Sequence, residues 1–384
     1  MKSPPTPELV LLIRGGADHP QDLLGGRTPL DYAELPGLRA LSRRGRPHPF
    51  NVAPSGHAGH GGGDLFAAFG VTAEPGEDLP VAAVTWHGTG ETAGIMAIHA
   101  DPVRMAVSYE ATVVMDPDEL ALTRDEAEAL VATLNEQLFA GTGAYLAVVS
   151  PGRWVLHLEA RPDIRTVPLE GWIGADASGG LPEGPQRGEW HRLINEAQMV
   201  LAAHPVNEDR RREGRSEVNS LWFWGGGALP AAGSPGWQAV WGEAPELTGL
   251  ARLTGVPERG PVTDFGEMVA EAAGDGPILA VADTPRVAGA RGDLGAKVDA
   301  LEDLDREWLG PLEAALASRQ LAAAWVILGP EAPTGTRAAE PVPAAPALAC
   351  RGGRVWPWSR PKPVNESLAA GRTVGWADLL GDGP

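Results

Sequence analysis

The order of apolar and polar positions along the chain predicts strands that alternate with helices. Continuous apolar runs of roughly four to eight residues are typical of buried strands. Such runs are ELVLLI (8–13), PVAAVTW (80–86), ILAVA (278–282) and LAAAWVIL (321–328). Helical patterns lie between them, as in LPGLRALSRRG (35–45). Strands that alternate with helices predict a doubly wound, mostly parallel α/β sheet with helices on both faces.

The pattern changes in the middle of the chain, where strand-forming residues surround one helix. VRMAVSYEATVVM (103–115) is rich in β-branched residues, and YLAVVSPGRWVLHLEA (145–160) has the pattern of a hairpin. Between them, Thr123 and Glu126 have the spacing of a capping box in front of an amphipathic helix. We therefore expect a smaller α+β cap domain at residues 101–188, inserted into a core of residues 1–100 and 189–384.

Composition and charge exclude several classes of partner. The formal net charge is −19, whereas nucleic-acid and anionic-membrane partners require a basic surface. No apolar run approaches the roughly 20 residues that a membrane span requires. The single cysteine, Cys350, excludes an internal disulfide and fits a reducing compartment. We expect a cytoplasmic protein, and the sequence identifies no protein partner.

Several segments resemble one enzyme family in the right order. They are GGRTPLDYAELPGLRALSRRG (25–45), TRDEAEALVATLNE (123–136), HPVNEDRRREGRSEVNSLWFWGGG (204–227) and GDLGAKVDALEDLDREWLGPL (292–312). Together they resemble a divergent bacterial branch of the archaeal-type cofactor-independent phosphoglycerate mutases, in the alkaline phosphatase superfamily. The resemblance implies a core of alkaline-phosphatase type with an inserted cap. It also implies two divalent cations and a nucleophilic serine, which together transfer a phosphoryl group.

The residues that would hold those cations are changed in this chain. The resemblance places the first ligand aspartate on Arg14, and the family's serine near Gly63. In DTPRVAGARGD (283–293), which we expect to be a loop, it places further ligands on Arg286 and Ala290. All nine histidines lie at or before His204, so the last 180 residues contain none. We therefore expect no metal cofactor and a non-catalytic pseudoenzyme with a regulatory or ligand-sensing role.

A displaced active site is the alternative. APSGHAGHGGGD (53–64) contains Ser55, His57, His60 and Asp64. Ser55 or Asp64 could then act catalytically, and His57, His60 and Asp64 could bind Mn or Zn. The chain would then be an active phosphoglycerate mutase or a metal-dependent phosphohydrolase. The other interpretation is a glycine-rich loop with surface histidines, because two ligands and an assumed third are weak evidence.

Arginines are the candidates for binding an anionic ligand. Arg14, Arg286 and Arg337 fall on positions that converge in the family fold, and the resemblance places Arg210 and Arg211 beside the substrate cleft. Guanidinium groups match phosphate oxygens, so a phosphorylated small metabolite is the expected ligand. In the other interpretation the arginines pair with the remaining acids, such as Asp64, Glu331 and Glu340. A third possibility is a binding scaffold that uses the surface tryptophans Trp356 and Trp358.

Overall fold

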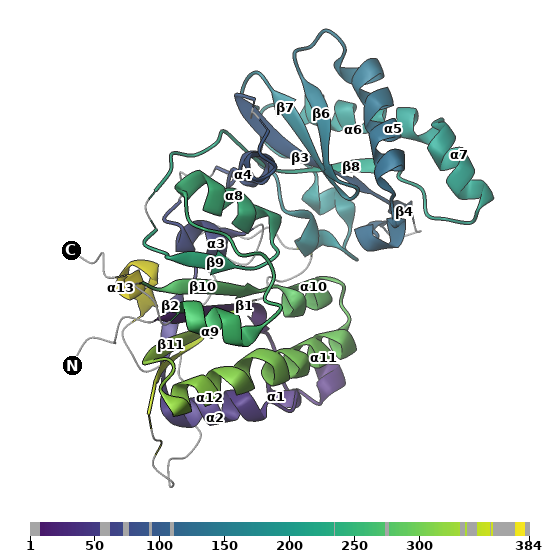
Figure 1. Ribbon diagram of the computed structural model, residues 1–384. Coiled ribbons are helices and arrows are strands. Elements are labelled where there is room, and N and C mark those ends of the chain that lie inside the picture. Colours follow the sequence, from purple (N-terminus) through teal and green to yellow (C-terminus); the bar gives the residue numbers. More distant parts are fainter. Residues whose placement is uncertain are drawn as a thin grey trace.

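The computed structural model describes most of the chain, with gaps between the described ranges. These ranges are 8–53, 62–71, 77–91, 94–107, 111–233, 235–272, 276–330, 335, 344–353, 355 and 373–380. Figure 1 shows a large sheet with its helices in the lower part of the view and a smaller sheet with its own helices in the upper part. Within these ranges no helix is long and apolar enough to cross a lipid bilayer.

The larger sheet is mostly parallel. Its strands are β1 (Leu9–Ala17), β2 (Gly45–Asn51), β9 (Ala239–Trp241), β10 (Ile278–Ala282), β11 (Ala323–Pro330), β12 (Ala345–Arg351) and β13 (Val374–Gly375). Their order is β13-β2-β12-β11-β1-β10-β9, and among them only β12 runs opposite to the rest. The predicted mostly parallel α/β sheet is confirmed.

Helices cover both faces of this sheet. Successive side chains of its buried strands point to opposite faces, so both faces are apolar and both must be covered. In β1, Leu9, Leu11 and Ile13 pack into one apolar cluster, while Val10 and Leu12 pack into another. The first cluster is covered by α1 (Pro29–Tyr32), α2 (Pro36–Arg44), α9 (Phe265–Ala272), α11 (Leu294–Leu304) and α12 (Gly310–Ser318). The second is covered by α3 (Gly63–Ala68), α8 (Pro245–Thr254) and α13 (Trp376–Leu380).

The smaller sheet is antiparallel and carries its helices on one face. Its strands, in the order β6-β7-β3-β8, are β6 (Tyr145–Ser150), β7 (Arg153–Leu158), β3 (Met96–Val103) and β8 (Ser220–Gly227). Its helices are α5 (Arg124–Leu134), α6 (Arg187–Ala202) and α7 (Pro205–Arg212). The predicted capping box of Thr123 and Glu126 begins α5. We call this sheet, its helices and the segments between them, residues 96–227, the inserted part.

The inserted part extends beyond the range 101–188 expected from the sequence. β8 pairs with β3 as an edge strand of the smaller sheet, and α6 packs on the same apolar cluster. The Trp190 and Phe223 rings meet edge to face, with their centroids 4.8 Å apart. The aromatic run before the glycines of β8 therefore serves the inserted part, a role that local patterning did not reveal.

Shorter elements complete the described structure. A two-stranded sheet is formed by β4 (Met105–Val107) and β5 (Thr112–Val114). Single turns are η1 (Asp22–Leu24), η2 (Pro117–Leu120), η3 (Asn135–Phe139), η4 (Leu169–Trp172), η5 (Ala177–Gly180) and η6 (Asp305–Leu309). The carboxylate of Asp305 accepts hydrogen bonds of 2.7 Å from the backbone N–H groups of Gly37 and Leu38. This side chain therefore caps the amino end of α2 and joins it to η6.

The strand predicted at residues 80–86 is wrong, because this segment forms helix α4 (Val81–Gly88). A short apolar run does not distinguish a buried strand from a buried helix. The close packing of α4 on α8 selects the helix. A Cβ atom at Gly249 would lie 2.1 Å from the carbonyl oxygen of Val84, so only glycine permits this approach.

The loop predicted at residues 283–293 is also wrong in part, because it contains helix α10 (Thr284–Ala290). Pro285 suits the first turn of a helix, and the N–H of Val287 donates to the carbonyl of Asp283 at 3.0 Å. The backbone of Arg286 lies against Gly15, which has φ of +69°. A Cβ atom there would lie 2.6 Å from the Arg286 Cα. Gly15, near the carboxyl end of β1, therefore makes room for α10.

Acidification should destabilise the protein through His157. Its ring is buried between Tyr145 and Trp86, and neither ring nitrogen has a hydrogen-bond partner among the described residues. Burial lowers the pKa of His157 from 6.5 to about 4. Between these values the unfolded chain binds a proton that the folded chain does not, so stability falls as pH drops from 6.5 to about 4. The shift corresponds to a loss on the order of 3 kcal/mol.

Urea denaturation of the wild type and His157→Phe between pH 7 and 4 measures this effect. Phenylalanine keeps the ring contacts and removes the titration, so the variant should lose less stability on acidification. Burial also lowers the pKa of His99, but His99 is present in both proteins, so its effect on stability cancels when they are compared. Parallel stability curves for the two proteins would contradict the assignment.

Candidate functional site

A buried arginine surrounded by carboxylates lies at the carboxyl end of β1. Arg14 Nε lies 2.8 Å from Asp64 Oδ2, and its Nη1 lies 2.8 Å from Asp283 Oδ1 and 3.2 Å from Glu246 Oε1. Only 4% of the Arg14 side chain is exposed. One guanidinium therefore holds three carboxylates from distant parts of the chain.

The order of the strands brings these residues together. Asp283 directly follows β10, which is parallel to β1 and adjacent to it. Glu246 lies in the first turn of α8, which follows β9, the next strand of the sheet. Asp64 lies in the first turn of α3. The carboxyl ends of parallel strands in an open α/β sheet form the crevice in which such folds place their ligand sites.

A second arginine extends the cluster to the inserted part. Arg286, on α10, lies with Nε 2.8 Å from Asp283 Oδ1, the oxygen that also contacts Arg14. Its Nη1 forms an ion pair with Glu170 of η4. The second oxygen of Asp283, Oδ2, is buried and has no hydrogen-bond partner among the described residues. We call these six residues the arginine–carboxylate cluster: Arg14, Asp64, Glu170, Glu246, Asp283 and Arg286.

Mutual attraction keeps the cluster ionised. Burial alone would raise the pKa of Glu170, but Arg286, Arg153 and Arg14 lower it to about 2. Burial likewise acts to lower the pKa of Arg14, but the carboxylates of Asp283, Asp64 and Glu246 raise it well above its usual value. The cluster has two guanidiniums and four carboxylates, so its formal charge is −2. It therefore does not offer unpaired positive charge to an anion.

Two further pairs of buried charged groups lie outside the cluster. The carboxylate of Asp101, on β3, accepts a hydrogen bond of 2.8 Å from the indole N–H of Trp224 and lies 3.4 Å from Arg153 Nη1. Closer to β1, Lys297 Nζ lies 2.8 Å from Asp18 Oδ2, and both side chains are almost fully buried. The first pair joins neighbouring strands of the smaller sheet, and the second joins α11 to the residue that follows β1.

The structure places some of the residues singled out in the sequence and leaves others out. Arg14, Arg286 and Asp64 come together in the cluster, where Asp64 contacts Arg14. Ala290 ends α10. Outside the described residues lie Ser55, His57, His60, Glu331, Arg337, Glu340, Trp356 and Trp358.

Arg210 and Arg211 do not join the cluster. Both lie on α7, which Figure 1 shows at the outer edge of the inserted part, far from β1 and α10. Arg210 is fully buried and pairs with Glu126 at 2.8 Å. Arg211 pairs with Glu217 on the surface. Their contacts are those of residues that hold α7 in place.

Sequence reasoning missed Glu170, Glu246 and Lys297. Glu246 carried a weak signal, because a Pro-Glu pair suits the first turn of a helix after a strand. Glu170 gave none, since it lies in an irregular segment and its arginine partner is 116 positions away in the sequence. Lys297 is fully buried on α11, and helical periodicity does not predict a buried charge without its partner.

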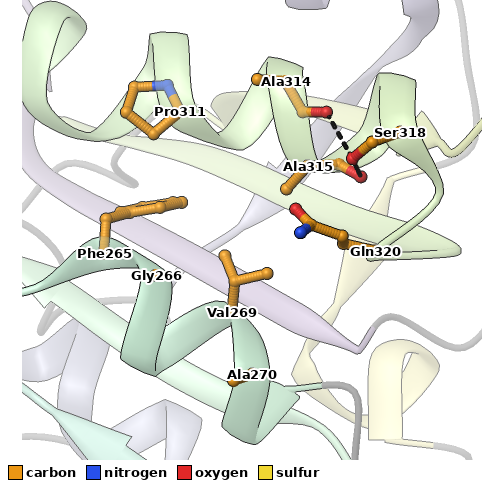
Figure 2. Close-up of a pocket in the computed structure, with 9 residues that line it drawn as sticks. All are labelled: Phe265, Gly266, Val269, Ala270, Pro311, Ala314, Ala315, Ser318 and Gln320. Atoms are coloured by element: carbon orange, nitrogen blue, oxygen red, sulfur yellow. Dashed lines mark hydrogen bonds between the residues drawn. The ribbon is translucent and has the colours of Figure 1, made fainter.

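A separate pocket lies between α9 and α12, with a volume of about 540 Å³. Its lining is mostly apolar, and Figure 2 shows Phe265 and Val269 facing Ala315 and Pro311 across it. No member of the arginine–carboxylate cluster lines it. The arginine–carboxylate cluster at the carboxyl ends of the strands is therefore separate from this pocket.

Comparison with known proteins gives consistent matches over most of the chain. A Geobacter sulfurreducens protein described as a probable 2,3-bisphosphoglycerate-independent phosphoglycerate mutase is 27% identical over 363 residues, which cover 86% of each chain. The 2,3-bisphosphoglycerate-independent phosphoglycerate mutase of Methanosarcina acetivorans is 26% identical over 330 residues, covering 79% of this chain and 80% of its own. The chain is a homologue of the cofactor-independent phosphoglycerate mutases.

A solved structure has a similar fold. The structure of the PH0037 protein from Pyrococcus horikoshii superimposes with a TM-score of 0.62 at 19% identity, over 97% of this chain and 95% of the other. No family model matches the chain. The chain thus shares the α/β fold of this solved structure over most of its length.

Proposed function

We propose that this chain is a phosphoglycerate-mutase-like protein that does not catalyse the mutase reaction. In this proposal the guanidiniums of Arg14 and Arg286 stand where the resemblance places ligands of two divalent cations. The observation that carries the proposal is the contact of Arg14 with Asp64, Glu246 and Asp283. These carboxylates are the hard ligands that a divalent ion needs, and a permanent cation already occupies them.

The electrostatics of the cluster support this proposal. Arginine remains protonated at any working pH, so its guanidinium group cannot itself become a metal ligand. A divalent ion at the same oxygens would also be repelled by two guanidiniums. Among the described residues, no group of three or more His, Cys, Asp or Glu side chains is placed to hold a metal. The described residues therefore do not fit a two-metal centre.

The proposed role is regulatory, with a phosphorylated small metabolite as the candidate ligand. The names of the homologues point to phosphoglycerate as the ligand class. Arg286 is the more accessible of the two arginines, with 20% of its side chain exposed against 4% for Arg14. A phosphate group would have to compete there with Glu170. Binding is therefore expected to be weak and to be lost in Arg286→Ala.

Metal content and turnover of the purified protein test the proposal together. We expect metal far below one equivalent per chain by elemental analysis, and no conversion of 3-phosphoglycerate with or without added Mn²⁺. Two bound divalent ions, or turnover abolished by a chelator, would contradict it. Calorimetry with 3-phosphoglycerate tests the sensing role separately, since absence of heat at millimolar ligand removes that role alone.

The displaced active site gives a different pattern of results. It requires metal-dependent turnover that is lost in Ser55→Ala or in His57→Ala with His60→Ala. One oxygen of Asp64 contacts Arg14 and the other accepts a hydrogen bond from the N–H of Leu65. Asp64 would therefore have to leave both partners before it could bind Mn or Zn. This requirement makes the displaced site the less favoured candidate.

A further inference from the structure

Helix α10 carries Arg286 and is followed directly by its C-cap residue Arg291, and both arginines contact the inserted part. Near its amino end, Arg286 pairs with Glu170 of η4. At its carboxyl end, Arg291 Nε lies 3.3 Å from Asp116 Oδ2, and its Nη2 pairs with Asp118 of η2. Figure 1 shows α10 on the side of the core that faces the inserted part. One short helix of the core thus contacts two separate turns of the inserted part.

Helix α10 is itself fixed to the core. The Arg286 backbone lies against Gly15 of β1, and Asp293 caps the next helix, α11, by accepting a hydrogen bond of 2.9 Å from the N–H of Ala296. Arg286 also contacts Asp283, which Arg14 holds. The position of Arg286 is therefore determined by the arginine–carboxylate cluster, and the cluster is connected through it to the inserted part.

The acids that α10 meets are fixed to the inserted part. Glu170 lies in η4 between the buried side chains of Leu169 and Trp172. Trp172 packs against Trp222 of β8, with ring centroids 6.2 Å apart. Asp116 also accepts a hydrogen bond of 3.0 Å from the N–H of Asp118, which orders the start of η2. If α10 moved away from the inserted part, Glu170 and Asp116 could keep their ion pairs only if η4 and η2 moved with it.

We propose that α10 is an electrostatic clamp that holds the inserted part closed over the core. The α10 clamp consists of three ion pairs: Arg286–Glu170, Arg291–Asp116 and Arg291–Asp118. The chain passes between the two parts near α4 and after β8, and Figure 1 shows α4 well apart from α10. The clamp therefore joins the two parts at a place remote from the covalent connections. It goes beyond the proposed function, because it requires neither turnover nor its absence.

The two ends of the clamp differ in strength. Arg286 and Glu170 are mostly buried, with 20% and 28% of their side chains exposed, so salt screens their attraction weakly. Arg291 and Asp118 are 41% and 67% exposed, and a pair of this kind contributes little by itself. The Arg286–Glu170 pair should contribute most of the free energy that holds the inserted part against the core. The pairs of Arg291 should add a smaller contribution that depends on salt.

Single-molecule distance measurements on the full chain test the clamp. Leu23→Cys in the core and Met199→Cys in the inserted part provide exposed labelling sites, while the native Cys350 is buried. We expect one narrow distance distribution for this labelled protein. Adding Arg286→Ala and Arg291→Ala should broaden the distribution or shift its mean. In the labelled protein that keeps both arginines, 1 M salt should cause a smaller change of the same kind, because it screens the exposed Arg291 pairs.

Hydrogen exchange gives a second readout. In the double variant, amides of residues 169–172 should exchange roughly tenfold faster, while amides of β1 and β10 should keep their protection. Arg306→Ala is the matched control, because Arg306 forms exposed ion pairs with Asp303 and Glu307 within the core. It should change neither measurement.

A charge reversal protects the test against variants that fold poorly. Arg291→Glu, at an exposed position, should speed exchange in η2. Adding Asp118→Lys should slow it again, because the exchanged pair restores the attraction and leaves Asp116 in place to cap η2. Distance distributions and exchange rates that are the same in the wild type, the double variant and Arg291→Glu, at low and high salt, would overturn the clamp. Loss of protection throughout β1 and β10 in the double variant would also overturn it, because the ion pairs would then stabilise the whole fold.

Discussion

Replacing Arg14 by alanine should lower the free energy of unfolding by about 3–5 kcal/mol, the range for removing one partner of a buried ion pair. The variant leaves the carboxylates of Asp64, Glu246 and Asp283 close together without the guanidinium that they share. Guanidinium chloride adds ions that screen this effect, so urea denaturation at low salt is the suitable measurement.

The same variant should acquire an affinity for divalent cations. Three carboxylates around an emptied position provide hard oxygen ligands, and a bound ion would replace the lost positive charge. Mn²⁺ at 100 times its dissociation constant would restore about 2.7 kcal/mol. Titration of Arg14→Ala with Mn²⁺, followed by the urea midpoint and by calorimetry, measures the recovery.

Arg44→Ala is the control for this prediction. Arg44 is as buried as Arg14, with 5% of its side chain exposed, but it pairs with one carboxylate, that of Glu313. Its removal should also destabilise the protein, and Mn²⁺ should not reverse that loss. Equal effects of Mn²⁺ on the wild type, Arg14→Ala and Arg44→Ala would show that the carboxylates around Arg14 are not a cation site.

Replacing Arg210 by alanine should also cost about 3–5 kcal/mol, although Arg210 lies far from the cluster. Its side chain is fully buried, and it donates to Glu126 Oε2 at 2.8 Å, to the Ser216 carbonyl at 2.7 Å and to the Leu120 carbonyl. Glu126 in turn completes the capping box of α5. Alanine would leave two buried carbonyls and part of a carboxylate without donors.

The neighbouring Arg211 provides the matched control. It lies on the same helix, its side chain is 43% exposed, and it pairs with Glu217 on the surface. Arg211→Ala should change stability by no more than about 0.5 kcal/mol. If Arg210→Ala were as stable as Arg211→Ala but lost binding of 3-phosphoglycerate, the ligand-binding role that the sequence suggested for Arg210 would be favoured over the structural one.

Much of the fold follows from local patterns. The apolar runs at 8–13, 278–282 and 321–328 lie in strands of the sheet, and the Thr123 capping box begins a helix. Both kinds of signal are local, since they depend on side chains a few positions apart. The segments at 80–86 and 283–293 failed for the opposite reason. Their helices depend on close approaches to Gly249 and Gly15, which sequence spacing does not reveal.

Part of the candidate site could likewise be predicted from the sequence, and part could not. The sequence indicated that Arg14 and Arg286 stand at unusual positions, because the resemblance supplied the residues expected there. It did not indicate that both contact one oxygen of Asp283, or that Glu170 and Glu246 complete the cluster. Those contacts join residues more than 100 positions apart, except for the pair of Arg286 with Asp283 and that of Arg14 with Asp64.

The sequence by itself determined the α/β class, the relationship to phosphoglycerate mutases and the absence of histidine after His204. These properties depend on residue type and local order, which a linear chain displays directly. Only the tertiary structure decided which acids neutralise which arginines and how α10 meets the inserted part. The free energy of a buried charge depends on its partners and its desolvation, and both are set when distant strands and helices come together.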